Sequence, residues 1–539
     1  MLKVLLILTF SSIILNATTY YVSPQGNNFN DGTINTPFAT VQRALDTAEP
    51  NDSIMVLEGH YIINSGLNIR DDSISLNCIG NVVLDGTFSN VNKKFIDFRH
   101  HNYVKLNGLT LTNIAFWGIW IDGNFNEVKN CKVLNVRYSG ICVIEASYNL
   151  VSNNVVHKVG TDSTEGNSIT IESKVDSFCN FTSADFNIIE YNKISLNRVH
   201  FGINLDVIYS DTSCSQQFVA TNNILRYNQI DSCWTGIYIR SNQNFDIYGN
   251  IIAYSDGISI QNEGYGIKLD YGSKFFVVDA HGRIYNNTIA WCYNTGLFNV
   301  CFKNLHIYNN AFYQNNSMNF AGSGYIRFDN ITGIQLSNNA YFGNNLYFYW
   351  NDIRMNKLEW QQYEVSAEFG DPSFVDPVND NYYLTENSAL RGTGLNLVEL
   401  DTFYNNRDIL NRIRPSSYNL HLNVWDIGAY EYYGALTNVS DDKITLDEYY
   451  LYNNYPNPFN PTTIIKFYLP ENSFVKLKIL DILGQKVSEG YNEVLEKGEH
   501  TYTFNASILS SGIYLYQLES INIKNGSAEI LTKKMMLIK

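Results

Sequence analysis

Apolar and polar positions between residues 104 and 341 repeat one short pattern. An aliphatic residue is followed by two variable positions, one polar slot and another apolar residue. Seven copies have asparagine in the slot: Asn154, Asn192, Asn228, Asn250, Asn287, Asn310 and Asn339. Cys131 takes the slot in an earlier copy, and Gly108 takes it in a degenerate first one. The shortest steps between slots are 22 or 23 residues, and such a period with short β runs predicts the stacked coils of a parallel β-helix.

Stacked coils would bring the slots into one column, where asparagine amides hydrogen-bond to one another. Leucine-rich repeats have a similar period, but their Leu-x-x-Leu-x-Leu frame is missing from this sequence. Three steps are longer, at 36 to 38 residues. The added loops are either tolerated surface insertions or the walls of a groove along one flank of the β-helix.

A second pattern, a small residue followed by alternating apolar and variable positions, also recurs in each coil. Strand side chains alternate, so the apolar positions point inward and the variable ones point outward in two columns. One outward column contains Trp120, Cys142, Thr170, Asn204, Tyr238, Lys268 and Phe298. The other contains Asp122, Ile144, Glu172, Asp206, Arg240, Asp270 and Val300. In one coil the run that begins at Gly257 could replace the run that begins at Gly266.

Composition supports an all-β chain and limits its partners. The chain has 539 residues, enough for two or three domains, with 39 Tyr, 30 Phe and only 10 Pro. Its net charge of −15 argues against nucleic acid as a partner. An acidic polymer would therefore need local cations for binding.

The N-terminus has the pattern of an export signal. Lys3 precedes an apolar run from residue 4 to residue 15, and we expect residues 1–17 to be a signal peptide. The run is too short to cross a membrane, so we expect no transmembrane segment in the mature chain. Export would place the protein where disulfides form.

The eight cysteines are interpreted in that context. Cys179 and Cys214 lie in consecutive loop insertions and are the predicted disulfide. Cys131, Cys233 and Cys292 fit buried free thiols in strand positions. The sequence has no Cys-x-x-Cys motif, which argues against a thiolate zinc site.

A short helix near the N-terminus would cover the open end of the β-helix. Thr36 can be its N-cap, with Pro37 at the first helical position. Its apolar face would contain Phe38, Val41, Ala44 and Leu45. Residues 20–62, with Tyr-Tyr-Val-Ser-Pro and Pro-Phe-Ala-Thr-Val, closely resemble the N-terminal segment of exported bacterial right-handed β-helix proteins.

Residues 371–431 resemble the closing segment of the same proteins, with Asp371-Pro-Ser-Phe and Asp426-Ile-Gly-Ala-Tyr-Glu431. The aspartates there are expected to be turn and cap groups. The predicted fold of residues 18–434 is a right-handed parallel β-helix, similar to the pectate lyase solenoid, with an N-terminal helical cap.

Residues 435–450 form a polar linker, and residues 451–539 alternate in period two like a small β-sandwich. The phrase Tyr455-Pro-Asn-Pro-Phe459-Asn-Pro resembles the C-terminal sorting domain of the bacterial type IX secretion system. The resemblance implies the secretion machinery as a partner and a secreted or outer-surface protein. We expect the protein to be a monomer.

Two outward carboxylates suggest a cation site. Glu172 and Asp206 would lie on adjacent strands, about 5 Å apart, where they repel unless a cation or a shared proton intervenes. Calcium takes six to eight oxygens, and Asp211 and Asp176 could complete its shell.

Lys268 and Arg240 would lie beside this ion. A lysine crowded by positive charge can act as a base, while Arg240 neutralises a substrate carboxylate. Further substrate contacts are predicted at Asn204, Tyr238, Asp270 and Trp120. The arrangement resembles that of β-helical polysaccharide lyases with calcium and a lysine base, although the sequence phrases of the pectate lyase, alginate lyase and polygalacturonase families are absent. It implies calcium-assisted β-elimination on a uronic-acid polymer.

Two other functions stay open. Asp206 and Asp270, two coils apart at about 10 Å, lie at the edge of the carboxylate spacing of inverting glycoside hydrolases. Alternatively, Arg240 between two aspartates is an ordinary surface ion pair on a non-catalytic glycan-binding or structural protein. The sequence names neither the polymer nor the bond that is cleaved.

Overall fold

The computed structural model describes residues 17–87, 94–160, 166–210, 214, 217–255, 263–270, 277–316, 323–329, 331–344, 346–400, 404–416, 423–434, 449–451, 454, 459–482, 484–524 and 528–537. The chain forms two compact units, Met1–Ala435 and Leu436–Lys539. Residues 1–16 of the predicted signal peptide and most of the predicted linker lie outside the described residues.

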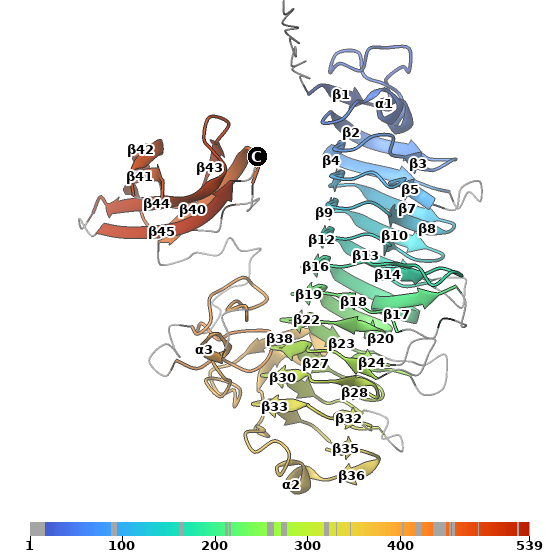
Figure 1. Cartoon of the computed structure of the whole chain (residues 1–539), viewed down its shortest axis with the longest axis vertical. Helices are drawn as coiled ribbons and strands as arrows, with labels where there is room; N and C mark the ends of the chain where they lie inside the picture. Colours follow the sequence, from blue (N-terminus) through green and yellow to red (C-terminus); the bar gives the residue numbers. More distant parts are fainter. Residues whose placement is uncertain are drawn as a thin grey trace, which may run out of the picture. The chain divides into compact units, whose positions relative to one another are not determined.

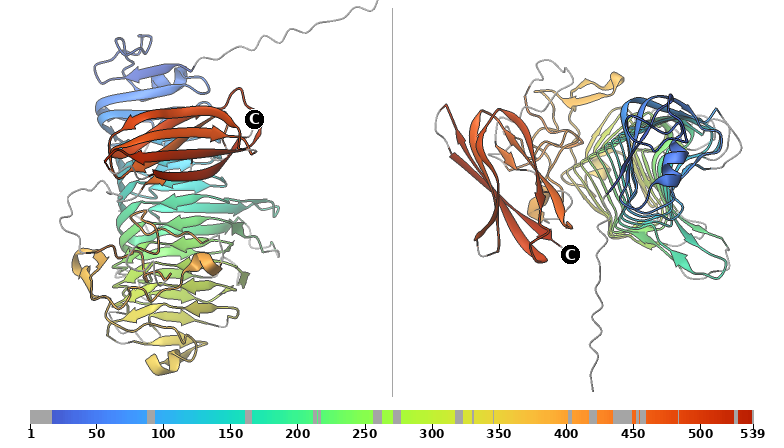
Figure 2. Two further views of the ribbon diagram at one scale, coloured as in Figure 1. Left: turned by 90° about the vertical axis from the view of Figure 1, so that its left-hand side faces the viewer. Right: turned by 90° about the horizontal axis from the view of Figure 1, so that it is seen from above.

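The first unit is a parallel β-helix whose coils follow one another from the N-terminus (Figure 1). A view along its axis shows the coils superposed (Figure 2). Each coil contributes to three stacks of parallel strands, and the longest strands continue from one stack into the next. The predicted β-helix is therefore confirmed.

The first stack contains β1 (Thr19–Val22), β2 (Ser53–Ile62), β4 (Ser75–Asp85), β6 (Lys105–Asn107), β9 (Glu127–Lys129), β12 (Leu150–Ser152), β16 (Ile188–Glu190), β19 (Ile224–Arg226), β22 (Asp246–Tyr248), β26 (Arg283–Tyr285), β30 (His306–Tyr308) and β33 (Gln335–Ser337). The second contains the ends of β2 and β4, then β7 (Thr110–Ile114), β10 (Lys132–Val136), β13 (Val155–Val159), β17 (Lys193–Tyr209), β20 (Gln229–Ile239), β23 (Ile251–Ala253), β27 (Thr288–Ala290), β31 (Ala311–Tyr313) and β34 (Ala340–Phe342). The third contains β3 (Leu67–Asn68), β5 (Lys94–Asp97), β8 (Trp117–Ile121), β11 (Ile141–Ile144), β14 (Ile169–Val175), the ends of β17 and β20, then β24 (Ile267–Leu269), β28 (Leu297–Asn299), β32 (Ile326–Phe328) and β35 (Phe348–Trp350).

The interior of the third stack is a column of aliphatic side chains. Strand register aligns Ile119, Ile141, Ile169, Ile203, Ile237, Ile267, Leu297 and Ile326, and all are fully buried. Each such side chain contributes about 1.5–3 kcal/mol through burial. A glycine precedes most of these positions because a Cβ at Gly202 or Gly236 would lie within 2.7 Å of a carbonyl oxygen of the next coil.

The predicted asparagine column is also confirmed. From Asn154 to Asn339 each side-chain amide donates to the side-chain oxygen of the next asparagine, at 2.9–3.0 Å. The Cys131 N–H donates to Asn154 at 2.9 Å. Beyond Asn339 the Glu364 carboxylate ends the column and accepts two hydrogen bonds from that residue. A second column, not anticipated from the sequence, contains Asn126, Asn149, Asn187, Asn223 and Asn242.

The helix of the N-terminal cap begins later in the sequence than predicted. Helix α1 (Val41–Thr47) has Thr40 as its N-cap, and the Thr40 side chain accepts from the Arg43 N–H. The prediction of Thr36 is wrong because Phe38 still forms a β-bridge with Val22, which keeps the chain extended past Pro37. Val41, Ala44 and Leu45 are buried as predicted.

The other end of the β-helix is closed by a hairpin and a short helix. Strand β36 (Ile353–Met355) pairs antiparallel with β35, and α2 (Lys357–Trp360) follows with a capping box between Asn356 and Glu359. Trp360 is fully buried against the last coils.

The described parts of the closing segment, within residues 371–434, cover outer faces of the first and second stacks in the later coils (Figure 1). The segment contains β37 (Phe374–Asp376), a 3-10 turn (Pro377–Asn379), β38 (Asn381–Leu384) and α3 (Leu397–Leu400). Tyr227, Tyr248 and Tyr285 of the stack pack beneath it with Trp425 and Tyr430.

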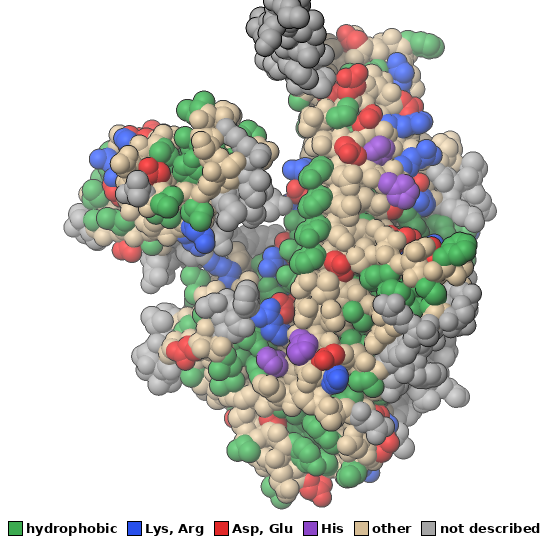
Figure 3. All heavy atoms as spheres, in the orientation of Figure 1, with side chains coloured by type: hydrophobic (Ala, Val, Ile, Leu, Met, Phe, Trp, Pro, Cys, Tyr) green, Lys and Arg blue, Asp and Glu red, His purple; other side chains and the backbone are tan. Residues whose placement is uncertain are grey.

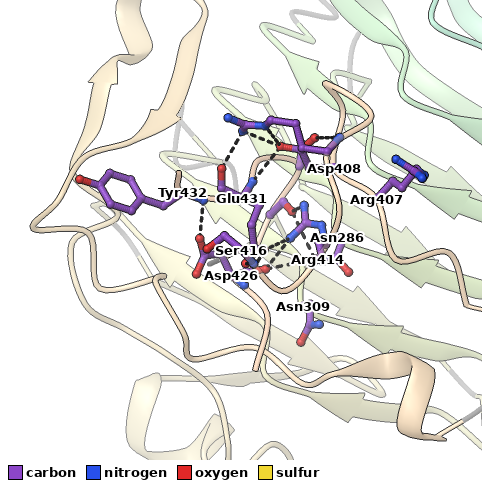
Figure 4. Close-up of polar contacts among 12 residues, drawn as sticks. Asn286, Asn309, Arg407, Asp408, Arg414, Ser416, Asp426, Glu431 and Tyr432 are labelled. Carbon is purple, nitrogen blue, oxygen red and sulfur yellow. Dashed lines mark hydrogen bonds and ion pairs between the residues drawn. The ribbon is translucent and has the colours of Figure 1, made fainter. Parts of the chain in front are cut away.

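Buried polar groups hold the described parts of the closing segment together (Figure 4). The Asp408 carboxylate accepts from the backbone N–H of Leu410 and from the Arg412 guanidinium. The Arg414 guanidinium donates to the Glu431 carboxylate and to the Asp426 carbonyl oxygen. Burial raises the pKa of the Glu431 carboxyl, although Arg414 opposes the shift. The aspartates of this segment thus bind backbone and arginine groups, as expected of turn and cap residues.

The second unit is a sandwich of two antiparallel sheets. One contains β39 (Tyr450–Leu451), β40 (Thr462–Leu469) and β43 (Gly498–Asn505), and the other contains β42 (Lys486–Leu495), β41 (Ser473–Leu480), β44 (Gly512–Asn522) and β45 (Ala528–Leu537). Phe467 and Phe504 from the first sheet share a core with Leu477 and Tyr516 from the second.

Candidate functional site

The third stack brings the predicted site residues together on its outer face. Pairing aligns Thr170 with Asn204, Asn204 with Tyr238, and Tyr238 with Lys268. The same register sets Glu172 opposite Asp206. The run that begins at Gly266 forms β24, whereas residues 257–260 lie outside the described part of the chain. The first predicted column has the predicted register from Trp120 to Phe298, and the second has it from Ile144 through Glu172 to Asp206.

Lys268 is a buried amine between two carboxylates. Its Nζ lies 2.6 Å from Glu263 Oε1 and 3.2 Å from Asp270 Oδ2, and the residue is 9% exposed. The rings of Tyr238 and Tyr265 lie 5.3 and 5.0 Å from this nitrogen. The closest charges are therefore negative, not the crowd of positive charge that the sequence suggested. The predicted role of Lys268 as a base stays a prediction.

Arg240 and Asp206 form an ion pair one strand away. The Arg240 Nη2 donates to Asp206 Oδ2, and Asp206 is only 3% exposed. Burial raises the pKa of the Asp206 carboxyl, and the charge of Arg240 only partly offsets that rise. The Arg240 guanidinium also lies 5.3 Å from the Tyr238 ring, so Tyr238 has a cation within 5.3 Å in Arg240 and another in Lys268.

Three buried polar atoms of this face lack a hydrogen-bond partner among the described residues. They are Arg240 Nε, Asp206 Oδ1 and Asn204 Oδ1. Buried polar atoms are usually paired, so an unfilled donor and two unfilled acceptors mark a place for water, a cation or a polar ligand.

Glu172 is held by a short chain of hydrogen bonds. Asn204 Nδ2 donates to Thr170 Oγ1 at 3.0 Å, and Thr170 Oγ1 donates to Glu172 Oε1 at 3.0 Å. This chain fixes one carboxylate oxygen directly across the stack from Asp206.

Calcium at this pair remains a prediction. In the described part of the chain, no group of three or more His, Cys, Asp or Glu side chains could hold a metal ion. Glu172 and Asp206 bring two carboxylates, and Asp206 is already paired with Arg240. The two unfilled oxygens fit a cation, but a shell of six to eight ligands would also need Asp211, which lies outside the described residues.

Aromatic side chains extend the face on both sides. Tyr238 stacks on Phe201 with ring centroids 4.1 Å apart, and its hydroxyl donates to Asp270 at 3.2 Å. Trp120 lies three strands before Asn204 in the same column, with the Lys94 ammonium 4.4 Å from its ring. Tyr238 is buried and Trp120 is half-buried. Aromatic rings on such a face can stack on sugar rings or simply stabilise a β surface.

The loop insertions build a wall beside the two carboxylates. The predicted disulfide between Cys179 and Cys214 is confirmed, and Cys131, Cys233 and Cys292 are buried free thiols as expected. Val175, Val207, Cys214 and Ala220 form a small separate core at this wall. The wall therefore fixes the strand ends just beyond Glu172 and Asp206.

Charged groups are sparse on the face of the β-helix that Figure 3 shows, where acidic and basic side chains lie singly or in small groups. No described helix is long and apolar enough to cross a membrane.

Family models match three parts of the chain. Residues 20–190 match "Pel9A-like, right handed beta helix region", and residues 117–279 match "Right handed beta helix region". Residues 453–536 match "Secretion system C-terminal sorting domain". The chain thus carries a right-handed parallel β-helix and a type IX sorting domain, which indicates secretion or attachment at the cell surface.

Several solved structures are similar in fold at low sequence identity. A complex of XylC with xylose is 10% identical with a TM-score of 0.48, covering 77% of this chain and 98% of that chain. Pectate lyase Pel9A is 15% identical with a TM-score of 0.46, covering 77% and 96%. A protein described as a glycoside hydrolase is 9% identical with a TM-score of 0.46, covering 60% and 96%. At these scores the likeness carries no argument about chemistry. No curated protein sequence matches the chain.

The fold and the sorting domain together support a secreted carbohydrate-active protein. The comparisons leave lyase and hydrolase chemistry unresolved.

Proposed function

We propose that this protein is a polysaccharide lyase that cleaves a uronic-acid-containing polymer on the outer face of the third stack. The observation that carries the proposal is the arrangement around Tyr238. The side chains of Arg240 and Lys268 each lie 5.3 Å from its ring. On the same face, the donor Arg240 Nε and the acceptors Asp206 Oδ1 and Asn204 Oδ1 are buried and lack partners among the described residues.

The groups suit β-elimination. Arg240 binds the carboxylate of the uronate, which acidifies the neighbouring proton on carbon 5. Once the ammonium proton of Lys268 has passed to the Glu263 carboxylate 2.6 Å away, the amine accepts the carbon 5 proton. The electron pair forms the double bond between carbons 4 and 5, and the bond from carbon 4 to the glycosidic oxygen breaks. The departing oxygen takes a proton from water. Glu263 and Asp270 hold the amine in a fixed place between the two rings.

Glu172, Asp206 and Asp211 are the residues that would hold calcium, which would supply further positive charge at the substrate carboxylate. Asn204, Tyr238, Asp270 and Trp120 would contact sugar hydroxyls and ring faces. These roles are proposals that the experiment below can separate.

Hydrolysis is the second candidate, and one observation favours it. Burial raises the pKa of the Asp206 carboxyl, which is the direction of shift that a general acid needs. Asp270 lies two strands away, about 10 Å, at the edge of the inverting spacing.

The test is mass spectrometry of products after incubation of the full chain with plant and algal polysaccharides, with calcium and with chelator. Unsaturated oligosaccharides that disappear in Lys268→Ala would support the lyase. Lys129→Ala is the matched control, because Lys129 also pairs with a carboxylate but lies on the first stack. Products that carry one added water would favour the hydrolase. The absence of products from every polymer would favour a glycan-binding or structural protein.

A further inference from the structure

A third cation lies on the same face, two strands beyond Lys268. Pairing aligns Lys268 with Phe298, Phe298 with Arg327, and Arg327 with Tyr349. The step from Lys268 to Arg327 is about 10 Å. An extended pyranose polymer advances by a similar distance over two sugar units, so Arg327 would lie two sugars from the proposed site of cleavage.

The Arg327 guanidinium lies near two aromatic rings of the adjacent strands. Its Cζ lies 5.7 Å from the Phe298 ring and 5.6 Å from the Tyr349 ring. Nε donates to Asp329 Oδ2 and Nη2 donates to Asp352 Oδ1, both at 2.8 Å. A planar guanidinium in such a position is well placed to bind a carboxylate through two hydrogen bonds.

The two carboxylates differ in how firmly they are placed. The side chain of Asp329 is 12% exposed, whereas that of Asp352 is 73% exposed. An ion pair with so exposed a partner contributes little and is readily exchanged for another anion. Asp329 therefore orients Arg327, while Asp352 accepts from Nη2 on the more exposed side.

A tight turn presents the Asp352 carboxylate to Arg327. Asn351 and Asp352 join β35 to β36 and have φ values of 49° and 63°. Positive φ at both positions is the pattern of a type I′ hairpin turn, which accepts asparagine as readily as aspartate. The charge of Asp352 can thus be removed without changing the turn.

We propose that Arg327, with Phe298 and Tyr349, is a carboxylate-binding subsite for a uronate two sugars from the cleaved bond, and that Asp352 occupies it in the absence of substrate. The proposal rests on the proposed function, because it assumes an acidic polysaccharide on this face. It predicts that two residues of one ion pair have opposite effects on binding.

The experiment measures the affinity of the full chain, in the Lys268→Ala background, for uronic-acid oligosaccharides of increasing length, with uncharged xylan oligosaccharides as control. Asp352→Asn is expected to tighten binding of the long acidic oligosaccharides by about two- to fivefold, because it removes a competing carboxylate. Arg327→Met is expected to weaken it on the order of tenfold. Arg70→Met, which removes an arginine paired with Asp46 near the N-terminus, should leave affinity unchanged.

Short oligosaccharides that do not reach Arg327 should respond to neither substitution, and xylan oligosaccharides should not respond to Asp352→Asn. If acidic oligosaccharides bind but Asp352→Asn weakens binding or leaves it unchanged, the subsite is wrong while the proposed function stands. If no acidic oligosaccharide binds and the wild-type chain cleaves none, both proposals fail. Circular dichroism and the melting temperature of each variant separate a binding effect from unfolding.

Discussion

The outer faces of the first and third stacks contain the same kinds of side chain, but they differ in how completely the polar atoms are hydrogen-bonded. On the first stack, Arg283 donates to both oxygens of Asp246 at 2.6 and 2.5 Å and stacks on Tyr404 of the closing segment. On the third stack, Arg240 pairs with Asp206, but its Nε and Asp206 Oδ1 have no partner among the described residues. Both faces thus combine a cation, a carboxylate and an aromatic ring.

The difference indicates which face is structural. The first stack satisfies its arginines within the protein and buries its tyrosines under the closing segment. The third stack leaves hydrogen-bonding capacity beside a buried lysine. On these two faces, a cation and a carboxylate therefore point to binding only where the pairing is incomplete, since a saturated pair has no hydrogen-bonding capacity left for a ligand.

The largest expected effect is on catalysis by the third stack. Lys268→Ala should lower turnover of the cleaved polymer by roughly a thousandfold, because the proposed proton acceptor is lost. The rate is measured from the ultraviolet absorbance of unsaturated products. Lys129→Ala should keep the wild-type rate, and a rate that falls equally in both variants would remove the distinction between the two faces.

The next effect is on stability through the first stack. Arg283→Met should lower the free energy of unfolding by about 3 kcal/mol, because it removes the arginine that donates to both oxygens of the buried Asp246 carboxylate. Chemical denaturation measures this loss. Turnover per folded molecule should not change, so a selective loss of turnover with normal stability would contradict a structural role.

A smaller effect is expected at the end of the asparagine column. Burial raises the pKa of Glu364 from 4.5 to about 6, although Tyr341 and Asn339 donate to it. Because the folded state holds the proton more tightly, this group adds stability below pH 4.5 that is lost as pH rises through 6.

The loss amounts to about 2 kcal/mol. Glu364→Gln should therefore flatten the change in unfolding free energy between pH 4.5 and 6.5 by most of that amount, about 1.5 kcal/mol, measured by denaturant titration at each pH. The Glu364→Gln substitution should leave substrate affinity unaltered, whereas substitutions on the outer face of the third stack should change it. An identical pH profile in wild type and variant would show that Glu364 keeps an ordinary pKa in the fold.

Strand periodicity made much of the architecture predictable. Alternation fixed which side chains of the third stack point outward, and the recurring slot located the column from Asn154 to Asn339. Loop insertions in consecutive coils were enough to pair Cys179 with Cys214. These features are repeated or local, so a single sequence is enough to predict them.

Other features depend on contacts that no local pattern encodes. Glu263 lies before β24, outside the repeated strand pattern, and its carboxylate accepts a hydrogen bond from Lys268. Glu364 lies in a segment without the repeat, and its carboxylate takes the place of the next asparagine at the end of the column. The cover of the first stack by residues 371–434 depends on long-range packing, and it decides which face remains available.

Hydrogen–deuterium exchange of the full Lys268→Ala chain, with and without a bound uronic-acid oligosaccharide, tests most directly whether the third stack is the binding face. The account predicts slower exchange in β17, β20 and β24 and unchanged exchange in β19, β22 and β26. Protection confined to the first stack or the closing segment, with none in the third stack, would contradict it.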